Sequence, residues 1–247
     1  MYVCMVIVSV LATGLTFAES ADNILDSVKK NNNFRWAYMK VKMVLEDSMG
    51  TKRERVFEWY MENENVEHKG VVVVTSPTSM NGIKFLFIKK GEEHLQYIYM
   101  PLMKRVRRIG MDESYSSFLG SDLTYYDLKH QNYSGYRNIL MGREACPQTG
   151  GSCYKIKTML NSNAPYKYIV QWIKVDAAIP VKISFFDTSG LVKVLEVKKI
   201  KNVKGHIIAS STHIHNVVTK HTTNITVEDV SIDTPLDERV FSFNALK

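Results

Sequence analysis

The first regular pattern along the chain is a short amphipathic one. Residues 21–30 (ADNILDSVKK) place Ile24, Leu25 and Val28 on one helical face, because positions i, i+1 and i+4 lie close together at 3.6 residues per turn. The remaining positions are mostly polar or charged. The pattern therefore predicts one short helix that buries a single face.

After this helix the apolar positions recur every second residue, which is the period of a β-strand. In residues 53–61, Phe57, Trp59 and Met61 share a face. The same period, between turns rich in Gly, Pro and Asn, predicts further strands at 84–89, 95–100, 168–175, 181–187, 191–200, 206–218 and 224–232. Many strands joined by short turns are typical of an antiparallel sheet or barrel. No long linker or repeat divides residues 19–247, so we expect one domain.

Several predicted strands are apolar on both faces. Phe85 and Phe87 would point to one side of the sheet, and Leu86 and Ile88 to the other. A sheet with one solvated face alternates apolar with polar residues instead. Such a sheet needs a second cover, which is either a packed helix or an apolar ligand. The pattern alone leaves both open.

The N-terminal residues 1–18 carry no charge and are apolar or small almost throughout. They are fewer than the roughly 20 apolar residues that a membrane span needs. The segment ends in Thr16-Phe17-Ala18, with small residues where a signal peptidase cleaves. We expect a secretory signal cleaved after Ala18 and an exported mature protein. An uncleaved anchor or a buried strand is the alternative.

The charge balance is basic, with 32 Lys and Arg against 25 Asp and Glu, a net charge of +7. An anionic partner such as a membrane surface, an anionic lipid or a nucleic acid fits this balance. The densest cluster is Lys104, Arg105, Arg107 and Arg108, four cations in five residues. We expect these residues to contact phosphate headgroups or an acidic partner, and a solvated charged loop is the alternative. The predicted export argues against nucleic acid.

Of the three cysteines, Cys4 lies in the predicted signal, which leaves one pair in the mature chain. Cys146 and Cys153 flank a turn-forming segment, 147–152, between two expected strands. Paired across a hairpin in an oxidising compartment, they would form a disulfide. Two buried thiols are the alternative.

Catalytic and metal-binding motifs find little support. His213 and His215 share a strand face, with His206 and His221 nearby, but no third ligand or open site is identifiable. Solvated histidines are the favoured interpretation, and a histidine metalloenzyme is a weak alternative. The chain has no nucleophile elbow, glycine-rich phosphate loop or H-E-x-x-H motif. We therefore predict no catalytic residue, no metal and no cofactor.

Five ordered segments of the chain resemble a bacterial family. They are the residues 76–86, 97–109 (YIYMPLMKRVRRI), 117–128 (SFLGSDLTYYDL), 153–156 and 236–246 (LDERVFSFNAL). Together they resemble the outer-membrane lipoprotein-sorting proteins, which are related to the periplasmic carrier LolA and its acceptor LolB. Met100 stands where this family usually has leucine.

This resemblance implies an α+β fold, an open and strongly curved antiparallel sheet (an incomplete barrel) with helices covering its concave face. It implies a periplasmic carrier without catalytic activity, whose apolar hollow holds the acyl chains of a lipid or lipoprotein. An inner-membrane exporter and an outer-membrane acceptor would be its partners. The alternative is an envelope interaction module, accessory to an exporter, whose hollow is filled by its own helix.

Large apolar residues on the predicted strands are the candidates for the hollow. They are Trp59, Phe85, Phe87, Tyr97, Tyr99, Trp172, Phe185 and Leu195. The sequence does not decide which face of each strand lines the hollow. The block Gly120–Leu128 is a candidate lid or partner surface, and we interpret its Asp122 and Asp127 as structural polar groups rather than a catalytic pair.

Overall fold

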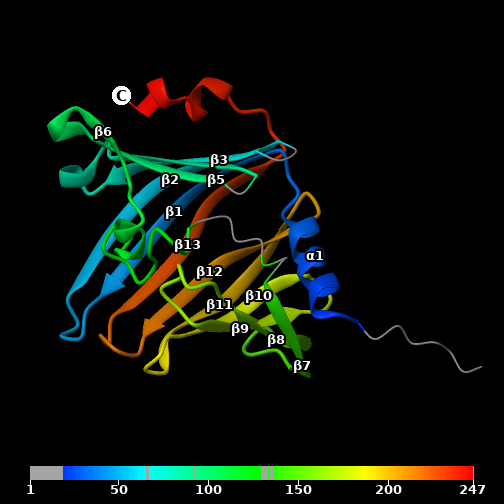
Figure 1. Cartoon of the computed structure of the whole chain (residues 1–247). Helices are drawn as coiled ribbons and strands as arrows, with labels where there is room; N and C mark the ends of the chain where they lie inside the picture. The colour runs from blue at the N-terminus through cyan, green and yellow to red at the C-terminus, as the bar shows by residue number, and fades with distance from the viewer. Residues whose placement is uncertain (1–18, 65–66, 92, 129–132, 134–135, 247) are drawn as a thin grey trace, which may run out of the picture.

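The computed structural model describes residues 19–64, 67–91, 93–128, 133 and 136–246 (Figure 1). Residues 1–18, with the predicted signal and Cys4, lie outside the described residues. Thirteen strands form one sheet in the order β6-β5-β4-β3-β2-β1-β13-β12-β11-β10-β9-β8-β7. The strands are β1 (Trp36–Glu46), β2 (Lys52–Glu64), β3 (Glu67–Ser76), β4 (Lys84–Lys90), β5 (Glu93–Met100), β6 (Arg105–Arg108), β7 (Arg137–Ala145), β8 (Ser152–Met159), β9 (Tyr168–Lys174), β10 (Ile179–Phe186), β11 (Leu191–Val203), β12 (His206–Asn216) and β13 (Thr222–Ile232).

Every neighbouring pair in this sheet is antiparallel, and most are consecutive in the chain. The pairing of β1 with β13 joins the two halves of the sheet. The edge strands β6 and β7 do not pair with each other, so the sheet is open. It curves around the segment that follows β6 (Figure 1), which confirms the predicted open antiparallel sheet.

The predicted helix is α1 (Ala21–Asn31). It begins where the Ser20 side chain accepts a hydrogen bond from the Asn23 backbone N–H, at 3.1 Å, as an N-cap does. Ile24 and Leu25 are buried, and they pack against one end of the sheet on Tyr154, Ile156 and Ile173.

The prediction that helices cover the concave face needs correction. The described residues contain one α-helix, which lies at one end of the sheet. The middle of the concave face is covered instead by residues 109–128, whose only regular element is a single 3-10 turn, η3 (Asp112–Tyr115). The strands that are apolar on both faces indicated that a cover is needed, and the resemblance implied that helices provide it. An irregular segment has no apolar period, so no pattern in the sequence identified residues 109–128 as the element that does.

The convex face has its own cover, a C-terminal strap formed by residues 233–246. It contains two 3-10 turns, η4 (Glu238–Phe241) and η5 (Phe243–Leu246), and runs across the outside of β3 and β5 (Figure 1). Phe241 and Leu246 are buried there against Val71 and Leu86. Strands such as β4 are apolar on both faces because each face has a separate cover.

The predicted disulfide is confirmed: Cys146 and Cys153 are joined across the β7–β8 hairpin, with a Cα–Cα distance of 4.9 Å.

Candidate functional site

The concave face is apolar across β1 to β4 and β13. In register, Val41 of β1 pairs with Phe57 of β2, and Phe57 pairs with Val74 of β3. Side chains directly opposite each other in a sheet share a face. These residues, with Met43 and Phe85, belong to one buried cluster. The face is therefore a continuous apolar surface several strands wide.

Residues 109–128, which we call the cover segment, lie on this surface. Phe118 is 1% exposed, and its ring meets the rings of Phe57 and Phe85 at centroid distances of 6.0 and 5.0 Å. The segment turns back on itself through a bridge between Ser117 and Thr124. Gly120 stands in this turn with φ +80°, a conformation that favours glycine.

A buried polar cluster fixes the cover segment to the sheet. Lys193 of β11 is 2% exposed. Its Nζ donates to Asp127 Oδ2 at 2.5 Å and to the Asp122 carbonyl oxygen at 2.7 Å. Asp122 Oδ2 accepts from Thr223 Oγ1 at 2.6 Å and lies 2.8 Å from His221 Nδ1. Both aspartates, interpreted as structural from the sequence, thus join the cover segment to β11 and to β13 with the turn before it.

Neighbouring rings complete this cluster. The Lys193 Nζ lies 4.8 Å from the ring centroid of Phe185 and 5.2 Å from that of Tyr166. Burial and the Asp127 charge raise the pKa of Tyr166, whose hydroxyl donates to Asp127 Oδ1 at 3.1 Å. Asp127 therefore has both an ion-pair partner and a neutral donor, and the cluster is chemically satisfied.

A cavity of about 150 Å³ remains between the sheet and the cover segment. It is lined entirely by apolar side chains: Met39, Val41, Met43, Phe57, Trp59, Val72, Ala209, Ile225 and Val227 from the sheet, and Phe118, Leu123 and Leu128 from the cover segment. Ligand pockets usually measure about 300 to 1,000 Å³. The present cavity therefore suits an apolar ligand only when the cover segment moves away.

Two hydrogen-bond donors on the concave face of β2 are buried without a partner among the described residues. They are the Nε of Arg55 and the indole Nε1 of Trp59. Trp59 lies across Gly70 of β3, where an added Cβ would stand 3.2 Å from Nε1. Buried donors are usually satisfied, so these two are the unusual polar groups of an apolar surface.

The structure divides the eight predicted lipid-binding residues between two faces. Trp59, Phe85 and Phe87 pack against the central concave cluster, and Phe185 and Leu195 lie together further along the sheet, where Phe185 is next to Lys193. Tyr97 and Tyr99 face the C-terminal strap, and the Tyr97 ring contacts that of Phe243 at 5.3 Å.

Trp172 also lies on the face away from the hollow. The Nζ atoms of Lys155 and Lys182 stand 5.0 and 5.1 Å from its ring. Both lysines are directly opposite Trp172 in register, on β8 and β10. Choosing residues by size on each strand ignored the register between strands, which decides the face. A lipid-binding role for the remaining five stays a prediction.

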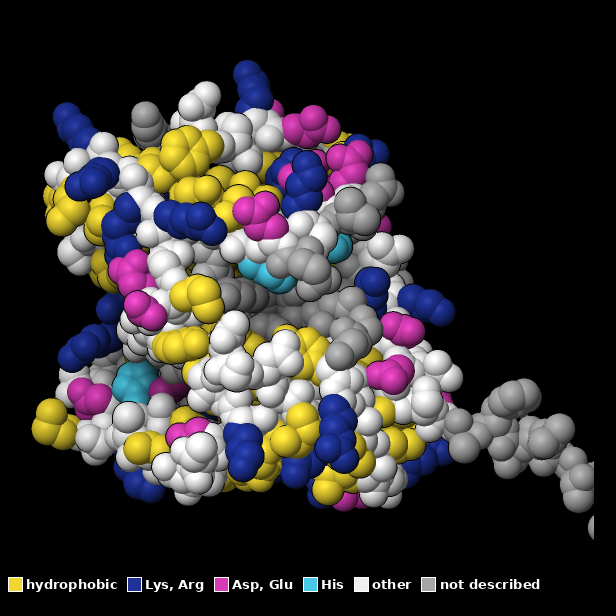
Figure 2. Space-filling model, viewed as in Figure 1, with side chains coloured by type: hydrophobic (Ala, Val, Ile, Leu, Met, Phe, Trp, Pro, Cys, Tyr) yellow, Lys and Arg dark blue, Asp and Glu magenta, His cyan; other side chains and the backbone are white. Residues whose placement is uncertain are grey.

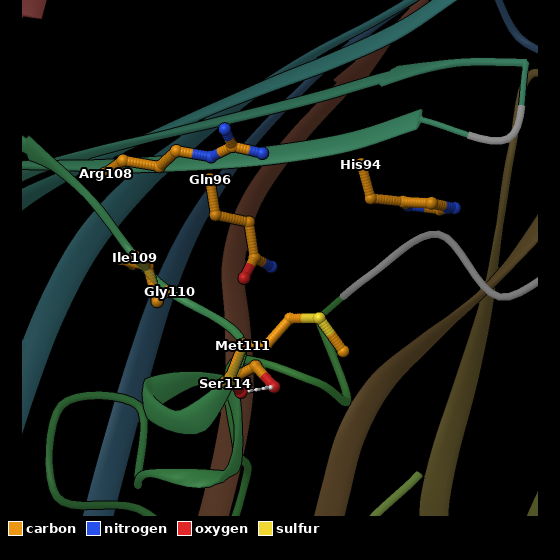
Figure 3. A pocket seen from close by; sticks show the side chains of 7 residues that line it. All are labelled: His94, Gln96, Arg108, Ile109, Gly110, Met111 and Ser114. Carbon is orange, nitrogen blue, oxygen red and sulfur yellow. Dashed lines mark hydrogen bonds between the residues drawn. The ribbon is translucent and has the colours of Figure 1, made fainter. Parts of the chain in front are cut away.

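The predicted cation cluster occupies β6 and the turn before it. Lys104 and Arg105 are exposed, close to Leu102, which is 95% exposed. The Arg107 guanidinium pairs with Glu113 at 2.6 Å and lowers the pKa of that carboxyl. Arg108 lines a second cavity of about 330 Å³ with His94, Gln96, Ile109, Gly110, Met111 and Ser114 (Figure 3).

The polar groups of this second cavity serve the cover segment. Gln96 reaches from β5 toward that segment (Figure 3) and donates through Nε2 to the Tyr125 carbonyl at 2.9 Å. The Ser114 hydroxyl donates to the Met111 carbonyl at 2.6 Å. The cavity therefore marks the place where the cover segment leaves the sheet.

Three of the histidines singled out in the sequence have different partners. The Nδ1 atom of His213 lies 2.8 Å from Asn224 Oδ1, and that of His206 lies 3.0 Å from the Asn31 carbonyl oxygen. The Nδ1 atom of His221 contacts Asp122. Within the described part of the chain, no group of three or more His, Cys, Asp or Glu residues is arranged to hold a metal ion.

The family follows from the chain's match to a family model. Residues 66–247 match the model of a family described as "Uncharacterized protein". The chain belongs to this family. The matched range covers β3 to β13, the cover segment and the strap. No curated protein matches the chain significantly.

Solved structures show which fold this family member has. A putative outer membrane lipoprotein-sorting protein domain from Vibrio parahaemolyticus has a TM-score of 0.85 at 23% identity, over 92% of this chain and 97% of that one. A DUF1329 family protein from Desulfovibrio piger has a TM-score of 0.87 at 21% identity, over 92% and 98%. A LolA superfamily protein from Nitrosomonas europaea has a TM-score of 0.72 at 17% identity, over 92% and 100%. The family member shares the LolA-like fold, as its sequence motifs predicted.

None of the helices in residues that the structure describes is both long and apolar enough to cross a membrane.

Proposed function

We propose that this protein is a non-catalytic carrier of the bacterial periplasm, which holds the acyl chains of a lipid or lipoprotein on its concave face. A membrane exporter would supply the cargo and an outer-membrane acceptor would receive it. The observation that carries the proposal is the wholly apolar cavity between the concave face and the cover segment. The likeness to a lipoprotein-sorting domain supports it at the level of fold.

The apolar contacts of the cover segment can be replaced by those of an acyl chain at small net cost. Burying a methylene contributes about 0.8 kcal/mol, so a dozen contribute roughly 10 kcal/mol. Phe118, Leu119, Leu123, Tyr125 and Leu128 of the cover segment pack on the same surface, and each large side chain buried there contributes about 1.5 to 3 kcal/mol. The two sums are similar, which suits a carrier that must both load and release.

Lipid extraction tests the proposal directly. The protein is purified without detergent, extracted and examined by mass spectrometry for lipid, and its uptake of a fluorescent fatty acid is titrated. We expect bound or bindable lipid. A protein that carries no lipid and takes up no fatty acid would contradict the carrier function.

A matched pair of variants locates the binding surface. Val227 lines the cavity, whereas its neighbour Thr226 is exposed on the other face of β13. We expect Val227→Phe to fill the cavity and weaken fatty-acid uptake at least about fivefold, because the phenyl ring occupies the space that the acyl chain needs and the chain buries fewer methylenes. Thr226→Phe should bind as the wild type does. Equal affinities of the two variants for the fatty acid would contradict binding on the concave face.

One observation favours the second candidate, an envelope interaction module with a filled hollow. Phe118 and its neighbours in the cover segment already occupy the centre of the concave face. In this case the hollow is filled by an irregular segment of the chain rather than by a helix. Phe118→Ala separates the two functions: a carrier with a loosened cover takes up fatty acid more readily, whereas a module stays free of it.

A further inference from the structure

A guanidinium group that has no acidic partner in the described part of the chain borders the apolar hollow. Arg55 is half-buried on β2, and its Nε is buried with no hydrogen-bond partner among the residues that the structure describes. Its Nη1 donates a hydrogen bond to the neighbouring Glu54 carbonyl oxygen, at 2.8 Å. Among the residues described, no carboxylate forms an ion pair with Arg55, whereas Arg107 and Arg239 each pair with one. A buried N–H donor normally has a hydrogen-bond partner, so the Arg55 Nε is an exception.

Arg55 belongs to the same face as the cavity. It is directly opposite Met43 of β1, and Phe57 is two positions further along β2. Both Met43 and Phe57 line the cavity. Residues two apart on a strand share a face and are separated by about 7 Å. The guanidinium therefore stands within one side-chain length of the apolar lining.

The surroundings of Arg55 are also positive. Arg53 shares the concave face because it is opposite Leu45 in register. Burial and the Arg53 charge lower the pKa of Arg55. Glu54, the carboxylate nearest in sequence, pairs with Lys42 at 2.7 Å. This end of β2 thus presents two cations on the concave face, and one of them has an unused donor.

We propose that Arg55 binds the oxyanion head of the ligand whose acyl chain occupies the hollow. The ligand is then an anionic amphiphile, with a carboxylate or a phosphate attached to its chain. This inference rests on the proposed carrier function and adds the chemistry of the head group. A guanidinium binds both oxyanions through paired N–H donors. Arg55 takes the role that the sequence suggested for the cluster Lys104–Arg108.

Three ligands with the same chain test the proposal. Dodecanoate and dodecyl phosphate carry an oxyanion, whereas dodecanol carries none. Each ligand is titrated into the protein of residues 19–247 by calorimetry at neutral pH. We expect at least about tenfold tighter binding of one or both anions than of dodecanol, since a hydrogen bond between two charged groups is stronger than one to a neutral hydroxyl. Which anion binds more tightly distinguishes the carboxylate from the phosphate source.

Variants show which residue causes the preference for anionic ligands. Arg55→Gln should remove the preference for the anions and leave dodecanol binding unchanged, whereas Arg55→Lys should retain part of it. Arg105→Gln, a change at an exposed cation of β6, should bind all three ligands as the wild type does. If Arg105→Gln rather than Arg55→Gln removes the preference, the headgroup site belongs to β6 and the proposal is overturned.

The remaining outcomes separate the two levels of the proposal. Tight binding of all three ligands with equal affinity overturns the Arg55 site and leaves the carrier function intact. Absence of binding to all three overturns both. Inorganic phosphate alone is the last arm: if it binds at Arg55 as tightly as dodecyl phosphate, the site is a free-anion site and the amphiphile is excluded.

Discussion

At the scale of single residues, the polar groups in the apolar interior decide where the cover segment lies. Lys193 is almost fully buried, and its Nζ donates hydrogen bonds to Asp122 and Asp127, which both belong to the cover segment. A buried ion pair contributes little net stability, but removal of one partner leaves a buried charge and costs about 3 to 5 kcal/mol. The cluster therefore specifies a position more than it stabilises the fold.

Lys193→Met measures the cost of removing one partner of the buried ion pair. We expect the free energy of unfolding to fall by about 3 kcal/mol, because Asp127 keeps its charge without its cation. Adding Asp127→Leu should restore part of the loss. Lys198→Met is the control on the same strand: Lys198 pairs with Glu196 at 2.7 Å nearer the surface, and its loss should cost at most about 1 kcal/mol. Urea unfolding measures all four proteins, and equal losses in the two single variants would contradict the prediction.

His68 of β3 gives a pH dependence at the same scale. Burial, with the charges of Lys89 and Lys29, lowers the pKa of His68 below the usual 6.5. The unfolded chain then binds the proton more readily, so stability is lost as the pH falls below about 6.5. We expect the wild type to lose more stability than His68→Asn between pH 8 and pH 5 in urea titrations. An identical loss in both proteins would show that His68 does not contribute.

At the scale of elements, β7 and β8 form the edge hairpin of one half of the sheet. Cys146 and Cys153 close it over a sequence separation of 7, and both are buried. An edge strand has a pairing partner on one side only. The disulfide therefore stabilises a hairpin whose outer strand lacks a neighbour among the described strands.

Replacing both cysteines by alanine should lower the free energy of unfolding by about 2.5 kcal/mol. Without the disulfide the unfolded chain gains the conformational entropy that closing a loop of this length removes. Denaturant titrations with and without reductant make the comparison. The reductant should bring the wild type to the level of the variant and leave the variant unchanged. A variant as stable as the oxidised wild type would contradict the prediction.

At the scale of the whole molecule, one curved sheet supports two different covers. Figure 2 shows the open side, with hydrophobic side chains exposed among charged ones. The cover segment crosses the concave face and is held there by Phe118 with its apolar neighbours and by the Lys193 cluster, whereas the strap covers the convex face with Phe241 and Leu246. This asymmetry fits a carrier in which one cover moves and the other is permanent.

Ending the chain after Thr234 removes most of the strap and tests whether the convex face needs this cover. Val71 and Leu86, 2% and 0% exposed, would then face water, and large exposed apolar patches promote association. We expect oligomers or aggregates by size exclusion with light scattering. Phe243→Ala is the control, since Phe243 is 47% exposed and its loss should leave the mass unchanged. A truncated chain with the mass of the full-length protein would contradict the prediction.

The sequence by itself determined the local features of this protein. The helix at 21–31, eight of the strands, the disulfide and the resemblance to the lipoprotein-sorting fold can all be read from periodicity and short motifs. Alternation along a strand reports its two faces without information from elsewhere in the chain. For the same reason Phe85 and Phe87 could be assigned to one common face.

Only the tertiary structure decided which face is concave and what covers it. Tyr97 and Phe85 lie on neighbouring strands, and their register puts them on opposite faces. Lys193 pairs with Asp127 over a sequence separation of 66 residues. Arg55 is notable only because no carboxylate of the described residues pairs with it. Register, long-range pairing and the lack of a partner are relations between distant segments, which no local pattern encodes.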